Sequence, residues 1–192
     1  MARKEYFSYE ERKRFDTPPV LSNKQRYIFN QLPQWAENFI KTIITPTNQI
    51  GFLIQLGYFR IVCRFFEPLQ FHQNDIFYVI ETLKRIDPNA IDMTIYQQSS
   101  SYYNHQQVIL NHLGFSPFSL DKRAMLLNEA QRLTHLQIKP TNILDLCMTF
   151  LRERRIEIPA YSSMQNIIHN AFSDYEIYLE KTLDKHLHQA DK

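Results

Sequence analysis

Two polar segments hold residue types that can read nucleic acid. The first, residues 96–107 (YQQSSSYYNHQQ), gathers glutamines, tyrosines, serines, one asparagine and one histidine, with no lysine, arginine or acidic residue. Asparagine and glutamine can form paired hydrogen bonds with adenine edges, while hydroxyls and helix-start amides suit phosphates. The segment predicts a helix start that enters a DNA groove, or else a polar start that only faces solvent. Its candidate DNA-binding residues are Tyr102, Tyr103, Asn104, His105 and Gln107.

The second segment, residues 151–168 (LRERRIEIPAYSSMQNII), places a cluster of arginines before Pro159 and a polar helix start after it. A basic helix end that holds the DNA backbone, a turn and a polar second helix are typical of a helix-turn-helix motif. A plain helical hairpin is the alternative. The candidate backbone contacts are Arg152, Arg154 and Arg155, and the candidate base-reading residues are Ser162, Ser163, Gln165 and Asn166.

No catalytic motif accompanies these segments. The sequence has no GxGxxG, P-loop, HExxH, GxSxG or CxxC pattern. His105 and His112 are seven residues apart, two helical turns and too far for one metal ion, and Glu10 and Arg14 have the i, i+4 spacing that merely supports a helix. We therefore expect no catalytic residue, no metal site and no cofactor, and a chain that is not an enzyme in itself.

The elements that must position these residues are predicted to be helices. Only three glycines occur in 192 residues, too few for a β-rich fold or a phosphate-cradling loop. Apolar residues recur at helical spacing between proline and glycine breaks, which predicts an all-α fold of about nine helices in two helix-turn-helix-like units. Helices are expected over residues 8–14, 34–45, 48–64, 90–96, 101–113, 119–136, 140–155 and 162–187, from Asn74 up to Asp87-Pro88, and as a short turn from Ser22.

Individual residues mark several of these helix boundaries. Ser8 and Glu11 have the spacing of a capping box, and Thr47 is expected to cap the long helix that follows it. Ser119 is expected to begin the helix over 119–136. Gly114 is expected to close the helix before it in the left-handed conformation.

A joint between two domains is expected near residues 68–74. This places one helical DNA-binding unit at residues 1–70 and a second, with the helix-turn-helix, at residues 71–192. Residues 1–64 carry ten lysines and arginines against five acidic residues, and residues 119–155 carry seven against four. Such basic segments could present a basic face to DNA although the whole chain has a net charge of only +2, and ordinary solvated helix faces would look the same.

Composition indicates a folded chain in water. Hydrophobic residues make up 44% of the sequence and charged residues 22%, and no apolar run is long enough to span a membrane. The first fifteen residues carry charges where a signal peptide needs its apolar stretch. We expect a cytoplasmic protein without a membrane partner, in which Cys63 and Cys147 are buried as small hydrophobic residues.

Three blocks of the sequence resemble the N-terminal region of Tn-three family transposases. Residues 48–65 are similar to the pattern NRLGFALQLCxLRYxGRF, residues 102–118 to RxEHLxxIRxYLGYRPF, and residues 147–168 to xxEWLRRRRILLPALSTLERLV. The blocks follow the same order and span most of the chain. The family's second position in the first block is often arginine where this sequence has Gln49, and Cys63 replaces the glycine of its GRF element.

The resemblance implies a bacterial, nucleoid-associated DNA-binding module that recognises the terminal inverted repeats of a transposon, while the catalytic acidic triad lies outside these residues. It adds weight to the DNA-binding candidates Asn48, Gln49, Arg60 and Arg64 in the first block, to His105 in the second, and to the three arginines and Ser163 in the third. The expected partner is duplex DNA, with self-association through the rest of a transposase. The alternative is a helical protein-interaction module that assembles transposase subunits or binds a regulator.

Overall fold

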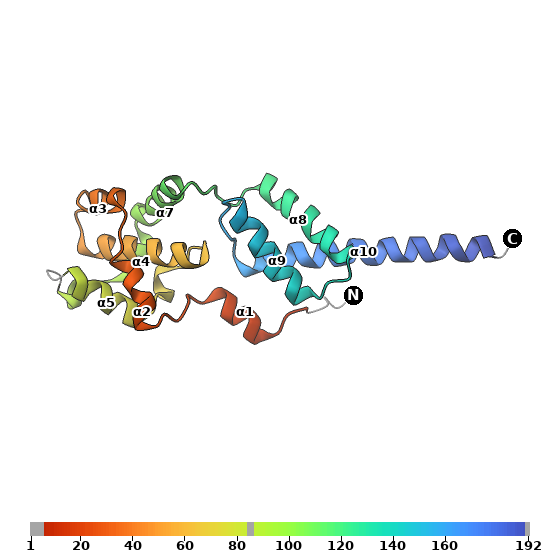
Figure 1. Ribbon diagram of the computed structural model, residues 1–192. Helices are drawn as coiled ribbons and strands as arrows, with labels where there is room; N and C mark the ends of the chain where they lie inside the picture. Colours follow the sequence, from red (N-terminus) through yellow and green to blue (C-terminus); the bar gives the residue numbers. More distant parts are fainter. Residues whose placement is uncertain (1–5, 84–86, 191–192) are drawn as a thin grey trace. The chain divides into compact units, whose positions relative to one another are not determined.

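The computed structural model describes residues 6–83 and 87–190, and within these ranges the chain is helical, with ten α-helices, three short 3-10 helices and no strand (Figure 1). The predicted all-α class is confirmed. Most predicted helices begin within one or two residues of the observed ones. The last turn expected before Asp87-Pro88, over residues 84–86, lies outside the described residues.

The helices form two compact units, which we call the middle unit, Arg14–Ser116, and the split unit, Met1–Lys13 with Pro117–Lys192. The predicted boundary at residue 70 falls inside the middle unit. The prediction was that residues 1–70 and residues 71–192 each bind DNA. No observation tests this, so it stays a prediction.

The middle unit is built around one buried helix. The boundary between the two units falls within α1 (Tyr9–Asp16). The elements that follow α1 in the middle unit are α2 (Asn23–Arg26), η1 (Tyr27–Phe29), α3 (Gln34–Ile40), α4 (Pro46–Val62), η2 (Pro68–Gln70), α5 (Gln73–Leu83), η3 (Pro88–Ala90), α6 (Met93–Gln98) and α7 (Ser100–Leu113). Every residue of α4 from Ile50 to Phe59 is buried. A helix that is apolar on all sides must be enclosed by others, which explains why short helices surround it.

The start of α4 differs from the prediction. The expected cap at Thr47 is wrong, because the helix begins at Pro46 and Thr45 is its N-cap. Proline favours the first helical position, since its fixed φ suits a helix and its missing N–H would have no partner there. Thr47 is instead the second residue of the helix. Its side chain is buried, with the hydroxyl 3.4 Å from the carbonyl oxygen of Ala90.

Two glycines let aromatic rings approach the backbone of α4. A Cβ atom at Gly51 would overlap the ring of Tyr96 on α6, and one at Gly57 would overlap the ring of Phe29 in η1. Both rings are almost fully buried. The two glycines therefore fix how closely α6 and η1 pack on the central helix.

The split unit contains α8 (Leu120–His135), α9 (Pro140–Glu153) and α10 (Tyr161–Ala190). Its buried side chains include Leu126, Cys147 and Ile168, one from each helix. Phe7 from the N-terminal segment packs against Tyr161 with a centroid distance of 5.8 Å. The α10 helix continues well beyond α8 and α9 (Figure 1).

Candidate nucleic-acid interface

The clearest candidate surface in the middle unit is one face of α7. The helix starts immediately after α6, because Ser99 is both the C-cap of α6 and the N-cap of α7. Gly114 ends it with φ of 69°, as predicted. The buried face carries Tyr102, His105, Ile109 and Leu110. The exposed residues are five uncharged ones that can form hydrogen bonds, Ser100, Tyr103, Asn104, Gln107 and Asn111, and His112 near the end of the helix.

A buried hydrogen-bond network holds α7 in place. The hydroxyl of Tyr96 on α6 lies 2.8 Å from Nδ1 of His105 and accepts a hydrogen bond from Nε2 of Gln55 on α4 at 2.5 Å. The rings of Phe39 and Phe52 enclose the imidazole. Burial lowers the pKa of His105 to about 4, so the ring is neutral near pH 7.

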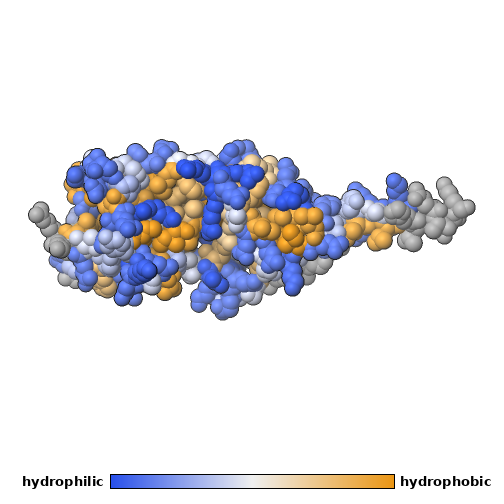
Figure 2. All heavy atoms as spheres, in the orientation of Figure 1, coloured by the Kyte–Doolittle hydropathy of each residue, from blue (hydrophilic) through white to orange (hydrophobic). Residues whose placement is uncertain are grey.

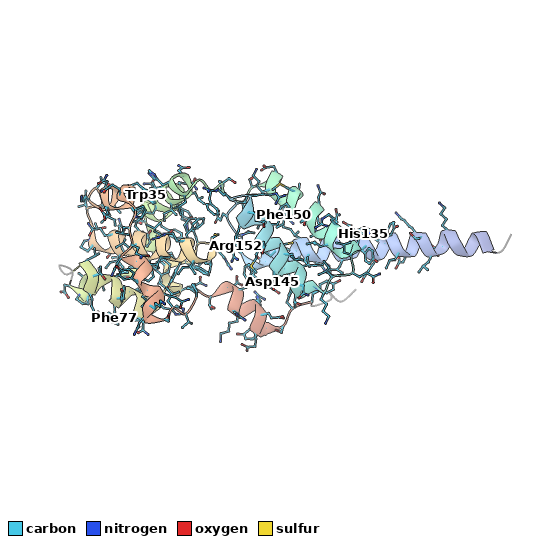
Figure 3. The ribbon with its side chains drawn as sticks, in the orientation of Figure 1. Trp35, Phe77, His135, Asp145, Phe150 and Arg152 are labelled. Atoms are coloured by element: carbon cyan, nitrogen blue, oxygen red, sulfur yellow. The ribbon has the colours of Figure 1, made fainter. Side chains whose placement is uncertain are left out.

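A second contact secures the far end of α7. Trp35 on α3 stacks on His112 with the ring centroids 4.3 Å apart and the planes 4° from parallel. His112 is exposed, and Trp35 is half-buried at the surface (Figure 3). This pair anchors α3 beside the end of the polar face. Sequence reasoning missed it, because residues so far apart in the chain show no common pattern.

The side-chain amides of Asn48 and Gln49, which were predicted to bind DNA, form hydrogen bonds within the fold. Nδ2 of Asn48 donates to the hydroxyl of Ser101 at 3.1 Å, and Nε2 of Gln49 donates to the carbonyl oxygen of Ile43 at 2.8 Å. Tyr102 is buried as well. These bonds give the residues structural roles, and DNA contacts by them stay a prediction.

The two arginines of the first block also bond within the middle unit. Arg60 donates through Nη1 to the carbonyl oxygen of Gln31 at 2.6 Å. Arg64, 9% exposed, pairs with Asp16 at 2.9 Å and donates to the carbonyl oxygen of Phe15. They form hydrogen bonds within the fold and do not belong to the exposed face of α7, and their contacts with DNA are untested.

The split unit carries the predicted arginine cluster. Arg152, Arg154 and Arg155 are all exposed at the end of α9 and just after it, and Figure 3 labels Arg152 and Phe150 on that helix. The guanidinium of Arg154 lies 3.7 Å from the centroid of the Phe150 ring. Arg155 has a left-handed backbone with φ of 53°. The chain then runs through residues 154–160 before α10 begins.

The start of α10 combines predicted and unpredicted residues. Ser162 is exposed, whereas Ser163, Gln165 and Asn166 are half-buried. The guanidinium of Arg12 on α1 lies 5.9 Å from the centroid of the Tyr161 ring, which adds a positive charge at this helix start. Sequence reasoning missed Arg12 because only the folded split unit brings the N-terminal segment to α10.

The outer surface of α9 carries an exposed leucine among polar and charged residues. Leu146 is 42% exposed, and hydrophobic residues reach the surface in the region of α9 on the face shown in Figure 2. Asp145 lies beside Leu146 in the sequence and is labelled on the same helix in Figure 3. The predicted backbone-binding arginines therefore lie near the end of an amphipathic helix whose outer face is partly apolar.

The described part of the chain brings together no set of metal ligands. It contains no group of three or more histidine, cysteine, aspartate or glutamate residues placed to hold a metal ion. None of its helices combines the length and apolar character needed to cross a membrane. Cys147 is buried, and burial raises the pKa of its thiol to about 12, so it is not a reactive thiolate at neutral pH.

A sequence similarity to a known protein indicates the class of protein to which this chain is related. The sequence is 22% identical to the transposase for transposon Tn1546 of Enterococcus faecium over an alignment of 187 residues, and the alignment covers 90% of this chain. The matched region covers 19% of that relative's length. The chain is thus a transposase-related, all-α domain that corresponds to a small part of such a protein.

The chain belongs to the family described as "Domain of unknown function (DUF4158)", whose sequence profile matches residues 7–171. The match includes α1 to α9 and the first part of α10. Both compact units are therefore represented in the family, and α10 beyond Ala171 lies outside the matched region.

Proposed function

We propose that this chain is the N-terminal DNA-binding module of a Tn-three family transposase and recognises the terminal inverted repeats of its transposon. The observation that carries the proposal is the exposed face of α7. It presents Tyr103, Asn104 and Gln107 beside one another on a helix whose opposite face is buried. Uncharged amide side chains on a firmly held helix suit base edges in a major groove.

The arginine cluster of the split unit has a complementary role in this proposal. Arg152, Arg154 and Arg155 are exposed cations within four residues, and such cations bind phosphates without regard to sequence. The module thus separates base reading by α7 from backbone binding after α9. The polar start of α10 is a second base-reading candidate.

The proposed module binds DNA ends but breaks no bond. The purified chain should therefore leave its repeat duplex intact in the presence of magnesium or manganese. Metal-dependent nicking by the pure chain would overturn this part of the proposal.

The central experiment compares binding to a terminal-repeat duplex and to a scrambled duplex at fixed salt. The double variant Asn104→Ala/Gln107→Ala should lower the ratio of the two affinities about tenfold, equivalent to about 1.4 kcal/mol, and leave scrambled-duplex binding nearly intact. The matched control is Gln73→Ala/Asn74→Ala, which removes the same side-chain types from an exposed part of α5. It should leave the ratio unchanged.

The same measurement on Gln165→Ala/Asn166→Ala tests the start of α10. If neither the α7 pair nor the α10 pair changes the ratio in folded protein, neither helix reads bases. The assignment of the recognition elements would then be wrong even if the chain binds DNA.

A helical protein-interaction module is the second candidate function. It is favoured by the second half of α10, where Ile177, Tyr178, Leu179 and Leu183 are between 39% and 61% exposed. Exposed apolar residues in such a group are typical of surfaces that meet a partner. Salt separates the two candidates, because a DNA-binding module loses affinity for duplex steeply as salt rises, whereas a pure protein-interaction module has no duplex affinity to lose.

A further inference from the structure

A cavity in the middle unit lies outside the α7 face. Its volume is about 550 Å³, and residues of α2, η1, α4 and α5 line it. The wall holds two cationic side chains, Lys24 and Arg60, two phenol rings, Tyr27 and Tyr78, and several side-chain amides. No acidic residue is among those that line it.

Arg60 is fixed in this wall by the backbone. Its Nη1 atom donates to the carbonyl oxygens of Ile28 at 3.2 Å and Gln31 at 2.6 Å. A guanidinium has five N–H donors, so others remain for a ligand. Burial lowers the pKa of Arg60, since its charge is partly removed from water.

Neighbouring arginines show how this fold usually balances a partly buried charge. Arg26 pairs with the buried Asp75 at 2.6 Å, and Arg64 pairs with Asp16 at 2.9 Å. In the described ranges, no carboxylate forms such a pair with Arg60. Because a partly desolvated cation is stabilised by an anion, the cavity is suited to an anion supplied from outside the chain.

The residues that line the cavity indicate which class of anion it binds. Two cations and amide donors suit phosphate oxygens, and Tyr27, 56% exposed, offers a flat ring on which a base can stack. We propose that this cavity binds a phosphate ester of nucleotide size, with the phosphate at Lys24 and Arg60 and the base or sugar against the tyrosines. The ester is either a free nucleotide or a nucleotide unit of a DNA strand, and only the second source rests on the function proposed above.

Nuclear magnetic resonance on the whole chain tests the cavity directly. The Nε–H signal of Arg60 and the ring signals of Tyr27 should shift on titration with deoxyadenosine monophosphate. Inorganic phosphate should shift the Arg60 signal alone, and deoxyadenosine, which lacks the phosphate, should leave the Arg60 signal in place. The variant Lys24→Gln should weaken the nucleotide titration by about threefold or more. The matched control Lys41→Gln removes an exposed lysine that does not line the cavity, and it should titrate like the parent chain.

The proposal is overturned if the nucleotide does not shift Arg60 at millimolar concentration, or if Lys24→Gln titrates like the parent chain. Two further titrations identify the source of the ester. A shift of Arg60 with an oligonucleotide, single-stranded or duplex, assigns the cavity to a DNA strand. A shift with the mononucleotide alone assigns it to a free nucleotide.

These outcomes are separate from those of the proposed function. If repeat and scrambled duplexes bind equally while the nucleotide still shifts Arg60, the sequence-specific function fails and the cavity stands. If the repeat duplex binds specifically while no phosphate ester shifts Arg60, the function stands and the cavity assignment fails.

Discussion

The hydroxyl of Tyr96 joins two buried polar side chains, since it lies 2.8 Å from Nδ1 of His105 and 2.5 Å from Nε2 of Gln55. One residue from each of α4, α6 and α7 thus meets in the core of the middle unit. If His105 carries its proton on Nε2, the tyrosine hydroxyl donates to Nδ1 and accepts from the glutamine. The orientation of the exposed α7 face depends on this contact.

Removal of the Tyr96 hydroxyl should therefore destabilise the middle unit. In Tyr96→Phe, the amide of Gln55 and the ring nitrogen of His105 are deprived of a shared partner in the core, which should cost about 1–3 kcal/mol of the free energy of unfolding. Urea denaturation measures the change. The control Tyr103→Phe removes a hydroxyl from a ring that is 66% exposed and should change stability by less than about 0.5 kcal/mol. Equal effects of the two variants would contradict the role assigned to the network.

Stability should depend on pH through His105. Its pKa is about 4 in the folded chain, because burial disfavours the charged ring, and about 6.5 when the chain is unfolded. Between these values the unfolded chain binds the additional proton, so the free energy of unfolding should fall as pH decreases from about 6.5 to about 4. Acidic residues add their own dependence, and a control variant is needed.

Urea midpoints at several pH values between about 4 and 7 test this expectation. The variant His105→Gln cannot titrate, so its stability should decline less steeply with acidification than that of the parent chain. Gln107→Ala changes an exposed residue of the same helix that does not ionise and should retain the full slope. A slope unchanged in His105→Gln would show that another group causes it.

Cys63 should be replaceable by glycine with a gain in stability. It is the C-cap of α4 and has a left-handed backbone with φ of 57°. A Cβ atom is unfavourable there by about 1–2 kcal/mol, while glycine costs about 0.5–1 kcal/mol more conformational entropy on folding. We expect Cys63→Gly to be more stable by about 0.5–1 kcal/mol. Cys63→Ala keeps the Cβ atom and should show no gain, and a glycine variant no more stable than the alanine variant would refute the explanation.

The three arginines after α9 should act through salt-sensitive binding to phosphates. Alanine at Arg152, Arg154 and Arg155 together should weaken repeat and scrambled duplexes alike and flatten the slope of log affinity against log salt by about one unit for each phosphate-binding arginine removed. Affinities measured at several salt concentrations provide both values. Lys181→Ala/Lys185→Ala is the matched control, since it removes exposed lysines of the same unit. Unchanged binding in the triple variant would assign the arginines to another role.

Local signals in the sequence predicted much of the helical framework. Ser8 and Glu11 form the expected capping box, with the Glu11 carboxylate accepting from the Ser8 amide at 2.7 Å. Ser119, expected to begin the helix over 119–136, is the N-cap residue of α8, one position before its first residue. Gly114 adopts its predicted left-handed conformation. These features depend only on residues within a turn or two of each other, so the sequence pattern is sufficient.

Long-range packing was less predictable. The sequence marks Arg60, Arg64 and His105 as polar, but their burial depends on carbonyl groups and rings contributed by distant residues. The exposed face of α7 could have been derived in part, since Ser100 and Asn111 follow the helical period of Asn104 and Gln107. The boundary of the compact units could not, because helix periodicity does not say which helices pack together.

The discontinuous make-up of the split unit has a consequence for synthesis on the ribosome. Phe7 and Tyr6 are among the first described residues to emerge, yet their ring partners Tyr161 and Phe172 belong to the last helix. All of Arg14–Ser116 is translated in between, and its internal packing can form first. The aromatic N-terminal segment thus stays without its native partners until translation reaches α10. While the residues between Phe7 and Tyr161 are synthesised, Tyr6 and Phe7 lack their ring partners on α10, and pairings of such large sequence separation are the slowest to form.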